Sequence, residues 1–172
     1  PPFVENYKNN QVFKYAVQQV NNNNSKLHII CYWDNNVTIE QLIIYLKYII
    51  PYVKTKICLH LVLTQKSLND YKTMIPYVNS INYDLSSKVK IGLITGENNL
   101  NKVLTLKDYV RSFIAVVGEK WKDIDKRFNT CINNRTTPNN MRTFIFNSDY
   151  SLDNNDQILF FNYSNINVDG LI

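Results

Sequence analysis

Glycine is scarce in this chain, with only 4 residues in 172. The glycine-rich phosphate-binding motifs GxGxxG and GxxxxGK[ST] are both absent, which argues against a dinucleotide-binding domain and against a P-loop. The GxSxG elbow that positions the nucleophile of many hydrolases is also absent. The enzyme classes that a short motif would reveal therefore receive no support.

Cysteine is nearly as rare, with Cys31, Cys58 and Cys131 making an odd count without any CxxC spacing. That pattern argues against a disulfide framework and against a structural zinc site. Cys31 and Cys58 lie inside apolar runs, where a thiol behaves as a small buried hydrophobe. We therefore expect a reducing compartment, cytoplasmic or intracellular. Because the sequence does not begin with Met, a signal peptide or an N-terminal anchor can precede it.

Long apolar runs and charge runs are missing too. The longest apolar stretches have about five or six residues, against the ~20 that cross a bilayer, so we expect no transmembrane segment in this chain. The net charge is +5, and the lysines are scattered. A nucleic-acid-binding domain usually concentrates its basic charge on one face, so nucleic acid is a secondary hypothesis.

Asparagine is what the chain has in excess, with 26 residues, and tyrosine is also frequent with 12. Both have AT-rich codons, so we interpret the bias as a property of an AT-rich genome. A large DNA virus, a protist or a low-GC bacterium would fit, and a viral protein is one hypothesis for its origin.

Hydrophobic patterning predicts alternating helices and strands. Three runs rich in β-forming residues predict buried strands over 27–33, 57–64 and 89–95. Apolar residues at helical spacing predict helices over 11–20 and 39–50, after Ser67, and over 105–117. The helix over 105–117 has an apolar face of Leu106, Tyr109, Val110, Phe113, Ile114 and Val117, which we expect to face the core.

The remaining segments complete the expected domain. Residues 1–10 are predicted to be a loose lead-in, and the polar stretch 129–141 a loop. The apolar runs 142–146 and 157–163 favour an antiparallel hairpin. The chain is thus expected to be a single α/β domain over 1–172. It would be a three-layer, Rossmann-like arrangement with a mostly parallel sheet, flanking helices and a C-terminal antiparallel hairpin at one edge.

A faint internal repeat accompanies this pattern. Leu27–Ile30 resembles Leu59–Val62, and Ile50–Val53 resembles Ile75–Val78. The two strand–helix units therefore share a strand motif and a motif near the helix end. A duplication and a coincidence in a skewed composition both explain this similarity.

Candidate ligand positions follow from the rule that open parallel sheets bind ligands outside the carboxyl ends of their strands. Asp34 and Glu97 follow two strands, and paired carboxylates there could hold Mg²⁺ or Mn²⁺ or divide acid and base roles. The alternative is that both are solvated turn residues. The other strand-end candidates for ligand binding are Asn35, Asn36, Thr64, Lys66, Gly96 and Asn98.

Two histidines occupy matching places in two predicted strands. If these strands are neighbours, His28 and His60 can share one face of the sheet, and alternation places Cys58 on the face of His60. A His/His/Cys metal site is one interpretation. Two hydrogen-bonded histidines in or beside the core are the other.

Aromatic residues gather on the predicted hairpin, where alternation turns one set outward. We predict that Phe161 and Tyr163 contact a partner, because an exposed aromatic edge strand suits a protein. The same rings could stack on the bases of a single-stranded nucleic acid.

Three functional hypotheses remain. The first is a non-catalytic protein-interaction or assembly module, with a protein partner or self-association and no cofactor. The second is a small metal-dependent enzyme acting on nucleotides or phosphoesters, with Mg²⁺ or Mn²⁺ between Asp34 and Glu97. The third is a nucleic-acid-binding domain. No catalytic motif is present, and this favours the first.

Overall fold

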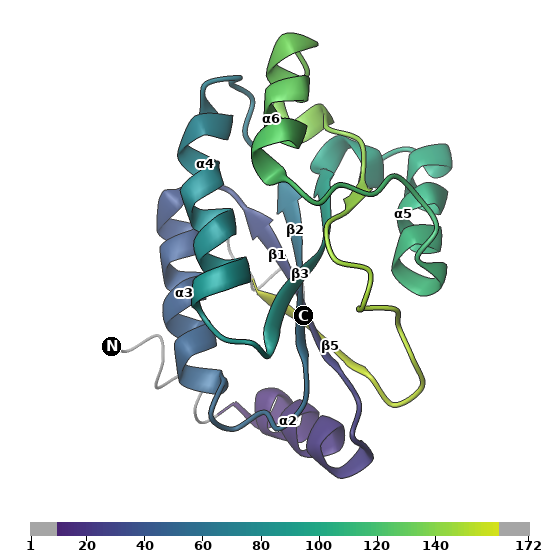
Figure 1. Ribbon diagram of the computed structural model, residues 1–172. Coiled ribbons are helices and arrows are strands. Elements are labelled where there is room, and N and C mark those ends of the chain that lie inside the picture. The colour runs from purple at the N-terminus through teal and green to yellow at the C-terminus, as the bar shows by residue number, and fades with distance from the viewer. Residues whose placement is uncertain (1–9, 162–172) are drawn as a thin grey trace.

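A computed structural model describes residues 10–161 of the protein (Figure 1). Its centre is a five-stranded mixed sheet in the order β4-β3-β2-β1-β5. Strands β3, β2, β1 and β5 are parallel, and β4 pairs antiparallel with β3. The strands are β1 (Leu27–Trp33), β2 (Ile57–Leu63), β3 (Val89–Gly96), β4 (Phe144–Ile145) and β5 (Gln157–Phe161).

Helices alternate with the first three strands, which confirms the predicted α/β class. They are α2 (Gln11–Asn23), α3 (Asn36–Ile49), α4 (Asp70–Asn79), α5 (Val103–Ala115) and α6 (Ile124–Asn133). Short turns of π or 3₁₀ helix are η1 (Ser80–Asp84), η2 (Glu97–Leu100) and η3 (Pro138–Asn140). None of the helices between residues 10 and 161 is long and apolar enough to cross a membrane.

The helical layers on the two sides of the sheet are unequal. Figure 1 shows α3 and α4 on one side of the strands and α5 on the other. Buried residues of α2, α3, α4 and α6 join the main core, whereas α5 packs into a second, smaller cluster with Tyr150 and Leu152. In the part of the chain that the structure describes, one face therefore has four helices, and the second face has α5 and part of the segment 146–156.

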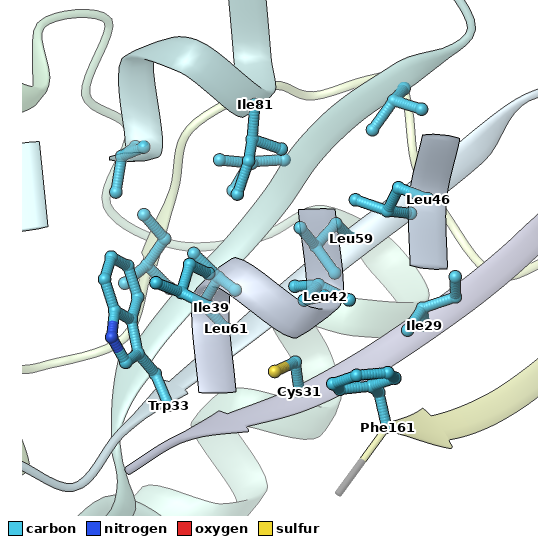
Figure 2. Close-up of a cluster of buried hydrophobic side chains, with 14 of the residues drawn as sticks. Ile29, Cys31, Trp33, Ile39, Leu42, Leu46, Leu59, Leu61, Ile81 and Phe161 are labelled. Carbon is cyan, nitrogen blue, oxygen red and sulfur yellow. The ribbon is translucent and has the colours of Figure 1, made fainter. Parts of the chain in front are cut away.

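Strict alternation along the strands creates the main core, part of which is shown in Figure 2. Odd-numbered residues of β1 and β2, such as Cys31 and Leu61, point toward α3 and are at most 1% exposed. On α3, Leu42 and Leu46 meet them at helical spacing. Even-numbered residues of both strands therefore point to the face that α5 covers.

The two C-terminal strands differ from the expected hairpin. An antiparallel strand does lie at one edge of the sheet, as β4 beside β3, but β5 lies at the opposite edge and runs parallel to β1. The segment 146–156 joins the two edges by crossing the second face, where the Tyr150 hydroxyl donates to the Ser112 carbonyl at 2.9 Å. Packing of this segment competes with a local turn and decides the pairing.

Part of the segment 129–141, predicted as a loop, is helical. Residues 129–133 are the last part of α6, because Phe128 and Cys131 extend the buried stripe that begins at Ile124. Asp123 caps this helix, since its side chain accepts a hydrogen bond from the backbone N–H of Lys126. The polar composition of the segment concealed the helical spacing.

The repeated sequence motifs occupy different structural positions. In the register of β1 and β2, Ile30 rather than His28 is the partner of His60, so the two motifs are offset by two residues. Pro51 follows the end of α3, whereas Pro76 lies inside α4. The similarity therefore does not correspond to equivalent places in the fold.

Candidate functional site

The carboxyl ends of the strands bring together only some of the predicted ligand-binding residues. Asp34 accepts a hydrogen bond from the Thr64 hydroxyl at 3.2 Å, and the same hydroxyl is 2.9 Å from the Trp33 carbonyl. Glu97 lies near Tyr32, whose pKa is raised by burial and by that negative charge. Lys66 is exposed to solvent.

A metal ion shared by Asp34 and Glu97 requires that the two residues follow neighbouring strands. In the structure they do not. Strand β2 lies between β1 and β3, so the two residues leave the sheet two strand spacings apart, which is about 10 Å. No group of three or more His, Cys, Asp or Glu that could hold a metal ion occurs in residues 10–161. The shared Mg²⁺ or Mn²⁺ site remains a prediction that this geometry does not favour.

The end of β3 is covered by the chain itself. Gly96 donates its backbone N–H to the Met141 carbonyl at 2.9 Å, and a Cβ at this position would lie 2.4 Å from the Asn139 carbonyl oxygen. Asn98 donates to the Asn140 side chain at 2.6 Å. The turn η3 therefore covers the strand end at which Gly96 and Asn98 were candidates for ligand binding.

The other two predicted residues, Asn35 and Asn36, form the start of α3. Asn35 is the N-cap of α3, and its Oδ1 accepts the backbone N–H of Thr38 at 3.1 Å. Asn36 is the first residue of that helix. The polar turn after β1 is thus explained by the start of α3.

A row of three buried acid–base side chains lies on the face of the sheet that α5 covers. The row consists of His60, His28 and Asp156, and we call it the histidine chain. His28 Nδ1 is 3.0 Å from His60 Nε2, and His28 Nε2 is 2.8 Å from Asp156 Oδ2. Asp156 also accepts the backbone N–H groups of Lys26 and Asp153, at 2.8 and 3.0 Å. The sequence predicted that the histidines could meet, but not that Asp156, which directly precedes β5, would join them.

The hydrogen bonds fix the tautomer of each ring. His60 Nδ1 accepts the backbone N–H of Leu93 at 3.2 Å, so a neutral His60 carries its proton on Nε2. That proton is donated to His28 Nδ1, which leaves the proton of His28 on Nε2 for Asp156. Both rings are therefore neutral, and the Asp156 carboxylate ends the chain.

A β-bulge explains why His60 is needed. The pairing of β2 with β3 shifts between Leu59 and Leu61, so that two residues of β3, Gly92 and Leu93, lie opposite His60. A bulge interrupts the ladder of backbone hydrogen bonds, and His60 satisfies the N–H of Leu93. Gly92 is required because a Cβ there would lie 2.8 Å from His60 Cε1.

The pKa values agree with neutral rings. Burial lowers the pKa of His28, although the Asp156 carboxylate opposes the effect, and burial together with His28 lowers that of His60 well below its usual range. Burial alone would raise the pKa of Asp156, but its hydrogen bonds outweigh burial and the pKa is lowered. Burial raises the pKa of Cys58 to about 12, so this thiol on the same face is protonated.

The histidine chain is sealed from solvent. The side chains of His28 and Asp156 have no exposed surface, and His60 is likewise 0% exposed. The Phe113 ring of α5 lies over both imidazoles, with centroids 5.2 and 4.6 Å away. A substrate cannot reach these groups, so what the arrangement can do is hold the β3 bulge, α5 and β5 together.

The outward face of β5 is the opposite of the one predicted from its aromatic residues. Phe161 is 1% exposed and packs against Tyr45 of α3, with ring centroids 5.3 Å apart. Ile158 and Phe160 point to the opposite face and are 40% and 68% exposed. Phe161 is therefore a core residue, because α3 covers its face, and Tyr163 lies outside the described residues.

Apolar residues are also exposed along α5. Of the predicted apolar face, Tyr109 and Phe113 are buried, whereas the rest is exposed to solvent. Val103, Leu106, Val110 and Ile114 follow one another at spacings of three and four, which makes a continuous stripe. We define the α5–β5 surface as Val103, Leu106, Val110, Ile114, Ile158 and Phe160.

Sequence comparison adds no family assignment to this geometry. No protein-family model matches the chain, and no curated protein shows significant similarity to it.

Proposed function

We propose that this domain is a non-catalytic protein-interaction module that binds a partner protein through the α5–β5 surface. The observation that carries the proposal is the exposed apolar stripe of α5, on the same side of the sheet as the outward residues of β5. All six residues of the surface are at least 40% exposed.

The size of the surface supports this function. A large apolar side chain has roughly 150–200 Å² of surface, so the six residues together expose on the order of 500 Å². This is at the upper end for the largest apolar patch of a typical monomer, and patches of that size are often binding sites. Exposure of this kind lowers solubility unless a partner covers it.

The histidine chain gives less support to catalysis than its composition suggests. His28, His60 and Asp156 are the densest group of acid–base side chains described, but they are sealed and their hydrogen bonds are mutually satisfied. Cys31, Cys58 and Cys131 are buried free thiols, so we extend the proposal to a reducing, intracellular compartment.

A matched pair of variants tests the proposed function. Val103→Ser removes an apolar side chain that is 71% exposed near the start of α5, and Val37→Ser removes one that is 52% exposed near the start of α3, on the other face of the sheet. Adding Val110→Ser and Ile114→Ser to the first variant makes a triple variant of the surface. Quantitative cross-linking in extracts of cells that produce the protein then compares the triple variant and Val37→Ser with the wild type.

A protein cross-linked by the wild type and by Val37→Ser, but not by the triple variant, supports the proposal. Equal recovery by all three proteins contradicts it. Circular dichroism of the variants establishes that a loss of binding does not come from unfolding.

A further inference from the structure

Within residues 10–161, α5 is the helix that packs on the second face of the sheet, and no other helix lies beside it there. The Phe113 ring of α5 packs over His28 of β1, and Ile158 of β5 is the register partner of His28. Phe160 is likewise the partner of Ile30. Both β5 residues lie on the face that α5 covers further along the sheet, and both are exposed. With Val12 of α2 they line a cavity of about 270 Å³ at this edge.

The exposed stripe of α5 faces this uncovered part of the sheet. The other border of the helix, which includes Asp108 and Ser112, lines a cavity of about 250 Å³ with Thr143, on the β4 side. At about 100° per residue, Leu106 and Val110 lie on the side of the helix away from that cavity. They therefore border the face of β1 and β5.

Positive charge borders the stripe on its solvent side. Lys107 and Arg111 are one turn apart and exposed, and Lys102 precedes the helix. Arg111 also lines the cavity on the β4 side, with Asp108 and Glu119, whereas Lys107 does not. The ion pairs within residues 10–161 involve Lys26 and Lys56 as the cations, so none of Lys102, Lys107 and Arg111 is neutralised by one. An acidic partner is electrostatically complementary to this border.

We propose that the partner of the α5–β5 surface is an acidic amphipathic α-helix that packs beside α5 and over β1 and β5. The inference rests on the proposed function and specifies its partner. The incoming helix completes the second layer in the way that helices cover both faces of an α/β sheet. Its apolar stripe meets the stripe of α5, and its acids meet Lys107 and Arg111.

The length of the α5 stripe sets the length of the partner helix. From Val103 to Ile114 it extends about 17 Å, or three helical turns. A partner of that length presents anchors at i, i+3 or i+4, and i+7, which is the pattern of helices that bind in apolar clefts. Acidic residues are expected along only the border of the partner that faces Lys107 and Arg111.

Two synthetic peptides test this inference with the full chain. Both are amphipathic helices of about 18 residues with the same leucine stripe, so that they are long enough to be helical. One has glutamates along the polar border and the other has lysines. Fluorescence anisotropy gives the Kd of each peptide for the wild type and for three variants.

The variants separate apolar contact from charge. Lys107→Glu with Arg111→Glu reverses the border charge, and Lys14→Glu with Lys72→Glu changes the net charge equally on α2 and α4. We expect the wild type and the control to prefer the acidic peptide by about tenfold, as two rim charges allow. The border variant should lose or invert the preference, and the Val103, Val110 and Ile114 triple variant should weaken binding of both peptides.

Several outcomes would overturn the inference. These are equal affinity for the two peptides, an unchanged preference in the border variant, or a dimer in sedimentation velocity that the triple variant abolishes. The last result would identify a second copy of the chain as the occupant. If the cross-linking of a partner protein still requires the apolar residues of the α5–β5 surface, the proposed function stands and only the acidic helix is refuted.

Discussion

Acidification should destabilise the domain through its two histidines. Because the chain contains only 2 histidines, His28 and His60 account for all histidine titration. In the unfolded chain each has a pKa near 6.5, and in the fold both pKa values are lowered. The unfolded state therefore binds more protons below pH ~6.5, so stability is retained above that pH and lost as the pH falls below it.

The magnitude follows from the number of protons. Two histidines that stay neutral in the fold give a limiting slope of about 2.7 kcal/mol per pH unit. With both rings neutral in the fold throughout, the free energy of unfolding should fall by about 2.7 kcal/mol between pH ~7.5 and ~5.5. Asp156 acts at lower pH, because its lowered pKa adds stability that disappears only when the pH falls toward that value.

Urea unfolding followed by tryptophan fluorescence measures this dependence, since Trp33 is fully buried. His28→Gln is the informative variant, because a Gln amide can accept from His60 and donate to Asp156 without titrating. This variant should halve the dependence of the unfolding free energy on pH, whatever its effect on stability at neutral pH. A free energy that stays constant or rises on acidification would refute the neutral pair and show that the histidines hold a proton in the fold.

Three further substitutions test the local arguments. Gly92→Ala should destabilise the fold by about 2–4 kcal/mol, because the new Cβ would lie 2.7 Å from the Tyr150 ring, and thermal melting should show this. Asn35→Ala should cost about 1 kcal/mol in urea unfolding through loss of the α3 cap. Phe161→Ala should cost about 3–5 kcal/mol but Phe160→Ala less than about 1, and the opposite order would contradict the assigned phase of β5.

Local sequence patterns were sufficient to predict the first two thirds of the fold. The β1 and β2 runs and the α3 stripe are recognisable because alternating strands and helices give strong, short-range periodicity. The partner of β5 was not recognisable, because residues such as Gln157 and Leu27 pair across 130 positions. A hairpin is the local alternative, and only the packing of the segment 146–156 across the second face excludes it.

The candidate site was likewise predictable in part, where it depends on local sequence patterns. The sequence placed His28 and His60 on one face, but the bulge at Gly92 and the contact with Asp156 depend on register and on a distant loop. The apolar face of α5 was also recognisable. That only Tyr109 and Phe113 of this face are buried could not be predicted, because burial depends on what else covers the sheet.

The position of β5 has a consequence for biosynthesis. One edge of β1 receives its partner only after the ribosome has added some 130 more residues, which takes roughly 6–26 s at ~5–20 residues per second. During that interval β2 and β3 can already pair, while β1 presents a row of unpaired backbone groups to solvent or to a chaperone. Slow codons placed just before Gln157 should therefore increase aggregation of the nascent chain, whereas the same codons placed before Leu27 should not, because β1 has not yet been made.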